Sequence, residues 1–311
     1  MRSRTLSTNG ASPAPLLDDA ELGRLHLITL QHRSRRRARS TTGWGDHPAR
    51  AHGPGLELHD SRPYQAGDDV RRMDWRATAR SGKATTKTFV AERARNVFIV
   101  VDRRPSMMFG TRGELKAATA ARVAAMLSFL ALAERDVVAG MVIEHGTTAF
   151  PAARRLEGVL PLLRAAAAAP RIPGDATLFA AARELGLNTA LARTADHAAT
   201  LYLIGDFNDV LRGYAAIADY LPGDHRGDRV AIRIVDPAER TLGDAGVLRL
   251  VSPHGGTPMV VDTGSGEIRR RYQAAVAERE AELRRHCAAH GVRLIEISSD
   301  RDLPAQLEPL L

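Results

Sequence analysis

The chain has 311 residues, and its 44% hydrophobic and 26% charged residues are typical of a soluble globular protein. The formal charge of +8 permits contact with nucleic acid, lipid or an acidic partner and selects none of them. The single cysteine, Cys287, excludes an internal disulfide, and no apolar run approaches the roughly 20 residues of a membrane span. These features predict a cytoplasmic protein without a membrane span.

Residues 1–42 predict a tail, a short amphipathic helix and a basic arm. The first 15 residues are rich in Ser, Pro and Gly, and leucines at 22, 25, 27 and 30 then indicate the helix. Five arginines follow within Arg33–Arg39. This cluster suits either an arm that binds nucleic acid or an acidic partner, or a solvated linker. Because runs of charge are mostly solvated, the linker is favoured.

Residues 43–95 predict a small β-rich or extended segment, because glycines and prolines interrupt them every few positions. The stretch 62–76 is dense in both charges. Asp68, Asp69 and Asp74 offer a possible metal cluster, but four arginines lie close enough in sequence to pair with them. An ion-pair network is therefore the expected arrangement.

From residue 96 to residue 311, apolar runs with strand and helix patterns alternate. Strands are expected at 97–101, 137–143, 147–150, 201–204, 230–235 and 292–297. Helices are expected at 114–133, 156–169, 176–191, around 214–217, 268–290 and 303–311, with a hairpin insertion near 246–262. Such alternation predicts a doubly wound, mainly parallel sheet of the α/β class.

Three of these strands end at an aspartate: Asp102, Asp206 and Asp236. Because the carboxyl ends of parallel strands meet at one edge of a sheet, the three carboxylates are expected to converge there. Ser106 and Thr177 add hydroxyl groups on loops. Oxygen ligands with open positions for water suit Mg²⁺, so this edge is the candidate site.

This layout resembles the metal-ion-dependent adhesion site of von Willebrand factor A domains. That family has Asp-x-Ser-x-Ser after its first strand, a distant Thr, and an Asp after a later strand. The matching positions here are Asp102, Arg104, Ser106, Thr177 and Asp206. Arg104 stands where the resemblance implies a serine ligand, and a guanidinium cannot bind a cation. Either the loop turns Arg104 away and Mg²⁺ binds weakly, or the arginine's charge takes the place of the ion.

A longer resemblance begins upstream. The stretch Tyr64–Arg80, which contains Gly-Asp-Asp followed by Asp-Trp-Arg, is similar to the signature of the DUF58 family, in which it precedes a von Willebrand-like domain. The candidate partner-binding residues in it are Tyr64, Gly67, Asp68, Asp69, Arg71, Asp74, Trp75 and Arg76. Whether they touch a partner or brace the sheet stays open.

Members of that family are typically encoded beside MoxR-type AAA+ ATPases and are thought to act with them in assembling or activating other proteins. The resemblance therefore implies a non-enzymatic interaction module that presents a degenerate adhesion site to such an ATPase. Bound Mg²⁺ is expected to be weak or absent. The sequence holds no Walker loop, so the chain itself is not expected to hydrolyse ATP.

Two enzymatic alternatives use the same strand ends. A Mg²⁺-dependent nuclease of PIN-like layout would employ Asp102, Asp206 and Asp209, with the Arg33–Arg39 arm on phosphates. The two hydroxyl residues favour the binding module, because two-metal hydrolysis needs more carboxylates. With the nuclease disfavoured, nucleic acid is not the expected partner. A phosphotransferase with Asp102 as nucleophile would need a second acid where Arg104 stands, which argues against that activity.

A last candidate lies near the carboxyl end of the chain. His286, Cys287 and His290 have helical spacing that suits a zinc site. No partner motif is evident, and Cys287 continues an apolar stripe of the same helix. Core packing is therefore expected for Cys287, and solvent exposure for both histidines.

Overall fold

The computed structural model describes residues 14–42, 57–65, 73–90, 94–170, 184–195, 197–213, 215–222, 227–250, 257–308 and 310. The chain divides into two compact units, residues 1–36 with 95–311, and residues 37–94. Each unit is described by itself below.

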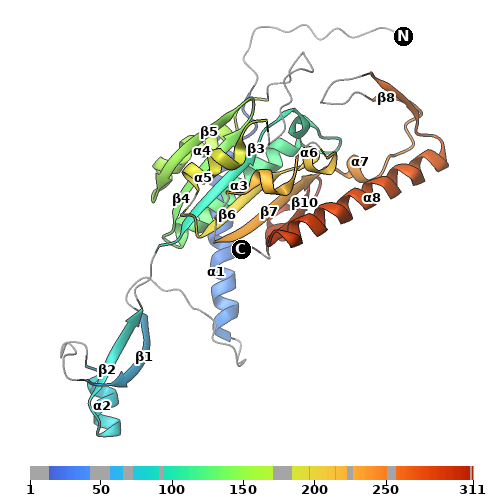
Figure 1. Ribbon diagram of the computed structural model, residues 1–311. Coiled ribbons are helices and arrows are strands. Elements are labelled where there is room, and N and C mark those ends of the chain that lie inside the picture. Colours follow the sequence, from blue (N-terminus) through green and yellow to red (C-terminus); the bar gives the residue numbers. More distant parts are fainter. Residues whose placement is uncertain are drawn as a thin grey trace. The chain divides into compact units, whose positions relative to one another are not determined.

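The larger unit is built on a six-stranded sheet in the order β10-β7-β6-β3-β4-β5 (Figure 1). Its strands are β3 (Asn96–Asp102), β4 (Val137–Ile143), β5 (Thr147–Ala153), β6 (Thr200–Gly205), β7 (Asp228–Val235) and β10 (Val292–Ser298). All neighbours are parallel except β4 and β5, which are antiparallel. The prediction of a mainly parallel α/β sheet is confirmed.

The helices of this unit are α1 (Asp19–Thr42, which extends past residue 36), α3 (Lys116–Ala133), α4 (Leu156–Ala166), α5 (Leu187–Thr194), α6 (Asn208–Leu211), α7 (Pro237–Arg240), α8 (Gly266–Ala289) and α9 (Leu303–Leu307). Two short 3-10 helices, η2 (Pro105–Met108) and η4 (Ile217–Tyr220), follow β3 and α6. Strands β8 (Val247–Leu250) and β9 (Met259–Asp262) form a separate antiparallel hairpin.

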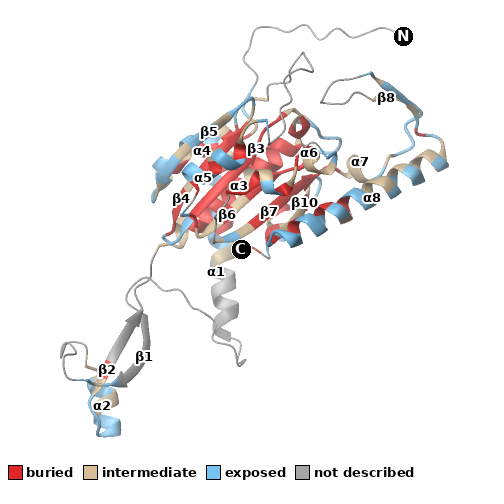
Figure 2. Ribbon diagram, viewed as in Figure 1, coloured by how far each residue is buried: buried red, intermediate tan, exposed pale blue. Residues whose placement is uncertain are grey.

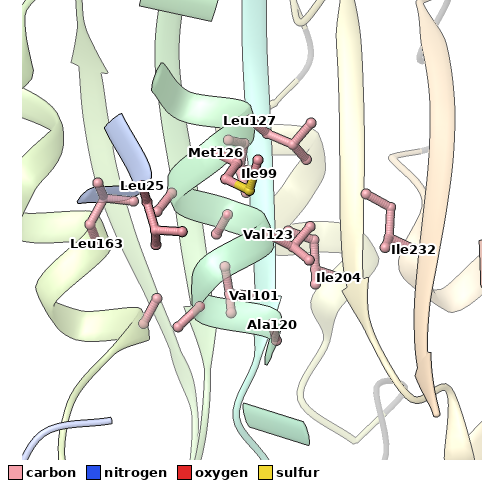
Figure 3. Packing of buried hydrophobic residues seen from close by; sticks show 14 of the residues in the cluster. Leu25, Ile99, Val101, Ala120, Val123, Met126, Leu127, Leu163, Ile204 and Ile232 are labelled. Atoms are coloured by element: carbon pink, nitrogen blue, oxygen red, sulfur yellow. The ribbon is translucent and has the colours of Figure 1, made fainter. Parts of the chain in front are cut away.

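Side chains of β3 alternate between two hydrophobic clusters, as a strand covered on both faces requires. Ile99 and Val101 lie in the cluster that contains α3, and Phe98 and Val100 lie in the cluster that contains α5 and η4. Figure 3 shows Val123 and Met126 of α3 packed over the sheet. Figure 2 shows the resulting band of buried strands beneath the helices.

Helix α3 occupies the centre of one face. Within the described part of the chain, it alone has the length and hydropathy of a membrane-spanning helix, and 83% of it is buried inside the protein. Its apolar surface therefore packs against the sheet, α1 and α4.

Several predicted elements differ from those observed. A 24-residue α1 replaces the short amino-terminal helix and continues through the arginine cluster. The helix expected around 214–217 is wrong: α6 ends at Leu211, because Gly213 takes a φ of 75°, and η4 begins only at Ile217. The helix expected at 176–191 lies partly outside the described residues, and its described part is α5, which continues to Thr194.

The smaller unit contains β1 (Glu57–Pro63), α2 (Trp75–Ser81) and β2 (Thr85–Val90). The two strands pair antiparallel, with Pro63 opposite Thr85. Gly82 ends α2 in the left-handed conformation, with a φ of 68°, and its N–H donates to the carbonyl of Thr78 at 2.9 Å.

Candidate functional site

The ends of β3 and β6 bring two of the predicted site residues together. Asp102 is the last residue of β3, and Asp206 directly follows β6, its parallel neighbour. Gly205 makes the approach possible, because a Cβ at that position would lie 2.9 Å from the Cβ of Asp102. The chain leaves β3 toward β4 and returns to β6 on the other side, so this is the switch point where open α/β sheets bind ligands.

The side chain of Arg104 turns inward onto Asp102. Its Nη2 lies 2.6 Å from Asp102 Oδ2, its Nε lies 3.0 Å from Oδ1, and its backbone N–H donates to Oδ1 at 2.9 Å. Both residues are buried. Of the two arrangements that the sequence leaves open, the structure has the one with the guanidinium beside the carboxylate.

Asp209 and Tyr220 hold the far side of the guanidinium. Arg104 Nη1 lies 2.8 Å from Asp209 Oδ2, and the Tyr220 hydroxyl accepts from Arg104 Nη2. The same hydroxyl donates to Asp209 Oδ1 at 2.5 Å. Burial raises the pKa of Tyr220 well above its ordinary value, so the phenol keeps the proton that this hydrogen bond needs.

Lys116 is the buried cation that contacts Asp206, as Arg104 contacts Asp102. Its Nζ lies 2.8 Å from Asp206 Oδ2 and 2.6 Å from Glu239 Oε1, and the lysine is fully buried. Burial acts to lower the pKa of Lys116, but the two carboxylates outweigh it, so this pKa lies above its ordinary value. Burial acts to raise the pKa of Asp206, but the charge and hydrogen bond of Lys116 outweigh it, so this pKa lies below its ordinary value.

We call these residues the strand-end network: Asp102, Arg104, Lys116, Asp206, Asp209, Tyr220 and Glu239.

The aspartate at the third predicted strand end, Asp236, is not part of this network. It caps α7 through Ala238 N–H at 2.9 Å and accepts from Thr111 N–H at 2.8 Å and Thr111 Oγ1 at 2.5 Å. Burial acts to raise the pKa of Asp236, but the hydrogen bonds from Thr111 outweigh it and lower this pKa. Asp236 thereby anchors the loop that follows η2.

Of the two hydroxyl residues of the predicted metal site, Ser106 lies among the described residues. Ser106 lies in η2 with a buried Oγ that has no hydrogen-bond partner among the described residues. Thr177 lies outside the described residues. In the described part of the chain, no three His, Cys, Asp or Glu side chains are grouped to hold a metal ion. With Asp102 facing a guanidinium and Asp206 facing an ammonium, this donor set does not fit a divalent cation.

Sequence reasoning missed Lys116, Tyr220 and Glu239. Lys116 carried a usable signal, because it is one of only three lysines in an arginine-rich chain and opens the most apolar helix. Tyr220 and Glu239 carried none, since the cations that they contact lie more than 100 residues away in the sequence.

The signature segment of the smaller unit is described in part. Asp74 is the N-cap of α2, accepting from the backbone N–H groups of Arg76 at 3.1 Å and Ala77 at 3.0 Å. Trp75 is exposed, and Tyr64 is half-buried and donates from its backbone to Ala84 at 2.8 Å. The other candidates, Gly67, Asp68, Asp69 and Arg71, lie outside the described residues.

Two further predictions concern single elements. Cys287 is buried in α8, and burial raises its pKa to about 11, while His286 and His290 are exposed, so core packing of the cysteine is confirmed. In the arginine cluster, Arg33 is half-buried, and the side chains of Arg35, Arg36, Arg37 and Arg39 lie outside the described residues.

Comparison with known proteins gives relatives without assigned roles. Uncharacterized proteins of Mycobacterium bovis and Mycobacterium tuberculosis are each 31% identical to this chain over 272 residues, 85% of this chain and 81% of the relative. Among solved structures, the conserved hypothetical protein BatB of Bacteroides thetaiotaomicron has a TM-score of 0.40 at 14% identity, over 68% of this chain and 94% of that chain. The PilB minor pilin of Streptococcus sanguinis has a TM-score of 0.34 at 10% identity, over 73% and 62%.

Those structural likenesses are too weak to carry an argument. The family match covers more than half of the chain and is strong enough to show the family. Residues 60–282 match the family described as "Protein of unknown function DUF58", which spans both the signature segment and most of the sheet. This chain belongs to the DUF58 family.

Proposed function

We propose that this chain is a non-enzymatic, cytoplasmic interaction module whose larger unit is a von Willebrand factor A-like domain that docks a MoxR-type AAA+ ATPase. The observation that carries the proposal is the state of the strand ends. Every acid of the strand-end network is already bound by a cation or a phenol of the same chain. The edge where such folds bind ligands is thus closed to small substrates and covered by an exposed loop.

Burial argues against the nuclease alternative. Asp102, Asp206 and Asp209 are at most 3% exposed, and each accepts a hydrogen bond from an internal cation. A carboxylate that is to hold a catalytic metal beside a phosphate must face solvent or substrate. These three face the interior, so their chemistry supports the fold.

The loop over this edge provides a surface for a partner. Phe109 is 42% exposed, and Arg112, three residues further along the same loop, is exposed. Lys116 lies beneath the aromatic ring, with Nζ 5.9 Å from its centroid, and Lys116 N–H donates to the Phe109 carbonyl at 2.9 Å. Thr111 fastens the loop to Asp236, as described above. An aromatic anchor beside an arginine suits a partner surface with an apolar pocket and acidic neighbours.

A loop held this firmly presents its aromatic ring at little entropic cost. Gly110 packs against the backbone of Glu114, where a Cβ would lie 2.2 Å from the carbonyl oxygen. The loop is therefore fixed at both ends and in the middle. Docking onto a prearranged surface avoids the ordering cost that a mobile loop would add.

The test is nucleotide-dependent co-purification with the MoxR-type ATPase encoded nearest to this gene. We expect binding in ATP and a loss of about tenfold in affinity for Phe109→Ala, as for an aromatic hot spot. Arg112→Glu should weaken binding through charge repulsion. Val260→Ala, at an exposed apolar position of β9, is the matched control and should bind normally.

Two outcomes would overturn the proposal. One is a wild-type affinity for both loop variants while their circular dichroism matches that of the wild type. The other is Mg²⁺-dependent cleavage of nucleic acid by the purified chain that is lost in Asp206→Asn.

A further inference from the structure

Within the strand-end network, each of the two strand-end carboxylates faces one cation. Asp102 and Asp206 are the two acids that the resemblance assigns to a divalent ion, and together they carry two negative charges. Arg104 contacts the first at 2.6 Å and Lys116 contacts the second at 2.8 Å. We infer that Arg104 and Lys116 jointly replace a divalent cation, so that this edge of the sheet is complete without metal.

Burial makes the pairing obligatory. Arg104 and Lys116 are at most 1% exposed, and Asp102 and Asp206 at most 3%. An unpaired charge at such depth is strongly destabilising, because water cannot solvate it. Each carboxylate therefore requires its cation, and a metal cannot enter unless both cations leave.

The remaining donors of the two cations have partners of their own. Arg104 uses Asp209 and Tyr220, and Lys116 uses Glu239. None of these three belongs to the ligand set that the resemblance implies. They accept further hydrogen bonds from a guanidinium and an ammonium, which a metal ion would not need.

The position of Lys116 supports the same conclusion. It is the first residue of α3, where the helix dipole disfavours a positive charge. No described residue of the first turn is acidic to offset this. What holds the ammonium there is Asp206 and Glu239, from elements remote in sequence. The lysine thus serves the strand ends rather than the helix.

Ser106 is the hydroxyl residue of the implied ligand set that lies among the described residues. It stands at a ligand position of the resemblance, its side chain is buried, and its Oγ has no hydrogen-bond partner among the described residues. A buried hydroxyl normally has a partner. The hydroxyl of Ser106 makes no hydrogen bond to Asp102, whose oxygens accept from Arg104.

Metal binding measured by calorimetry and thermal unfolding tests this inference, which does not depend on the proposed partner. Wild-type protein should give no saturable heat with millimolar Mg²⁺ or Mn²⁺, and its Tm should be the same in either ion and in EDTA. Arg104→Ser should remain nearly metal-blind, because Lys116 still occupies Asp206. The double variant Arg104→Ser/Lys116→Met should bind Mn²⁺ and gain several degrees in Tm from it.

Adding Asp206→Asn to the double variant is the matched control and should abolish the acquired binding. Saturable binding by the wild type that is lost in Asp206→Asn would overturn the inference. So would a folded double variant that is blind to both ions. If the double variant folds only with Mn²⁺, the inference is supported, and if it folds under no condition, the wild-type titration decides.

Discussion

Two networks of charged side chains lie in the larger unit, and they differ in their access to water. The strand-end network is buried almost throughout. A second group, which we call the rim network, joins β7, α7, α8 and β10 and consists of Arg233, Arg240, Glu280, Arg284 and Glu296. Its contacts are as short, with Arg233 Nη1 2.7 Å from Glu280 Oε1 and Arg240 Nη2 2.8 Å from Glu296 Oε2.

Similar distances do not mean similar energies. In the rim network, Arg233 and Glu280 are buried, but the side chains of Arg240 and Arg284 are 38% and 51% exposed, so water can solvate these two when they lose a partner. In the strand-end network, no such compensation exists for Arg104, Lys116 or their aspartates. Removing one partner should therefore be costly at the strand ends and mild at the rim.

The largest effect is expected for Lys116→Met. This change keeps most of the aliphatic volume but leaves Asp206 buried without its cation, and breaking a buried pair costs about 3–5 kcal/mol of unfolding free energy. Urea denaturation followed by circular dichroism measures it. Lys83→Met, at an exposed position of the smaller unit, is the chemically matched control and should stay within about 0.5 kcal/mol. Equal, small effects of both variants would contradict the comparison.

A smaller effect is expected for Tyr220→Phe. The phenol hydroxyl lies between Arg104 and Asp209, so its removal takes one hydrogen bond from each of these buried charges, although Asp209 Oδ1 keeps the backbone N–H of Val210 at 3.0 Å. The unfolding free energy should fall by about 1–3 kcal/mol. Tyr202→Phe serves as control, since that half-buried hydroxyl lies near the charges of Arg293 and Glu134 instead. A stability loss in the control as large as in Tyr220→Phe would show that the network hydrogen bonds add nothing.

The sheet was predictable from the sequence because its signals are local. The β-branched run before Asp102 is long enough for a strand and too short for a helix, and both faces are apolar, as in a covered parallel strand. The same logic placed Asp206 at the end of the neighbouring strand. It failed between α6 and η4, where the left-handed Gly213 interrupts an apolar pattern that looks helical.

The direction of the Arg104 side chain was not predictable, because two of the three residues that hold its guanidinium are remote in sequence. The guanidinium is drawn inward by Asp209 and Tyr220, which lie 105 and 116 residues further along the chain. The periodicity of apolar residues along the sequence gives no information on contacts between residues this far apart. Lys116 escaped notice for the same reason, although a lone lysine at the start of an apolar helix needs a buried acid to remain charged there.

Acid should weaken the rim network. Burial acts to raise the pKa values of Glu280 and Glu296, but hydrogen bonds and charges from Arg233 and Arg240 outweigh it and lower both. A carboxyl whose pKa is lower in the folded state contributes stability above its unfolded pKa and loses it as the pH falls through the folded value. Wild-type stability should therefore decline below about pH 4.5, the ordinary pKa of a glutamate.

Glu296→Gln removes one of these titrations and tests their assignment. We expect the variant to lose about 1 kcal/mol at neutral pH, as for a partly exposed charged pair, and to show a shallower decline in acid. Urea unfolding from pH 7 to pH 3 measures both. Parallel pH profiles of wild type and variant would mean that Glu296 has the same pKa in the folded and unfolded states.

The smallest effect is expected for Arg284→Ala, and it decides whether exposure or contact distance sets the cost. Arg284 Nη2 lies 3.1 Å from Glu296 Oε2 and 3.6 Å from Glu280 Oε2, but its side chain is half exposed. Both glutamates keep Arg233 and Arg240, so the loss should not exceed about 0.5 kcal/mol and should shrink further in high salt. A loss comparable to that of Lys116→Met would mean that the rim is as dependent on its pairs as the strand ends, and that burial does not separate the two networks.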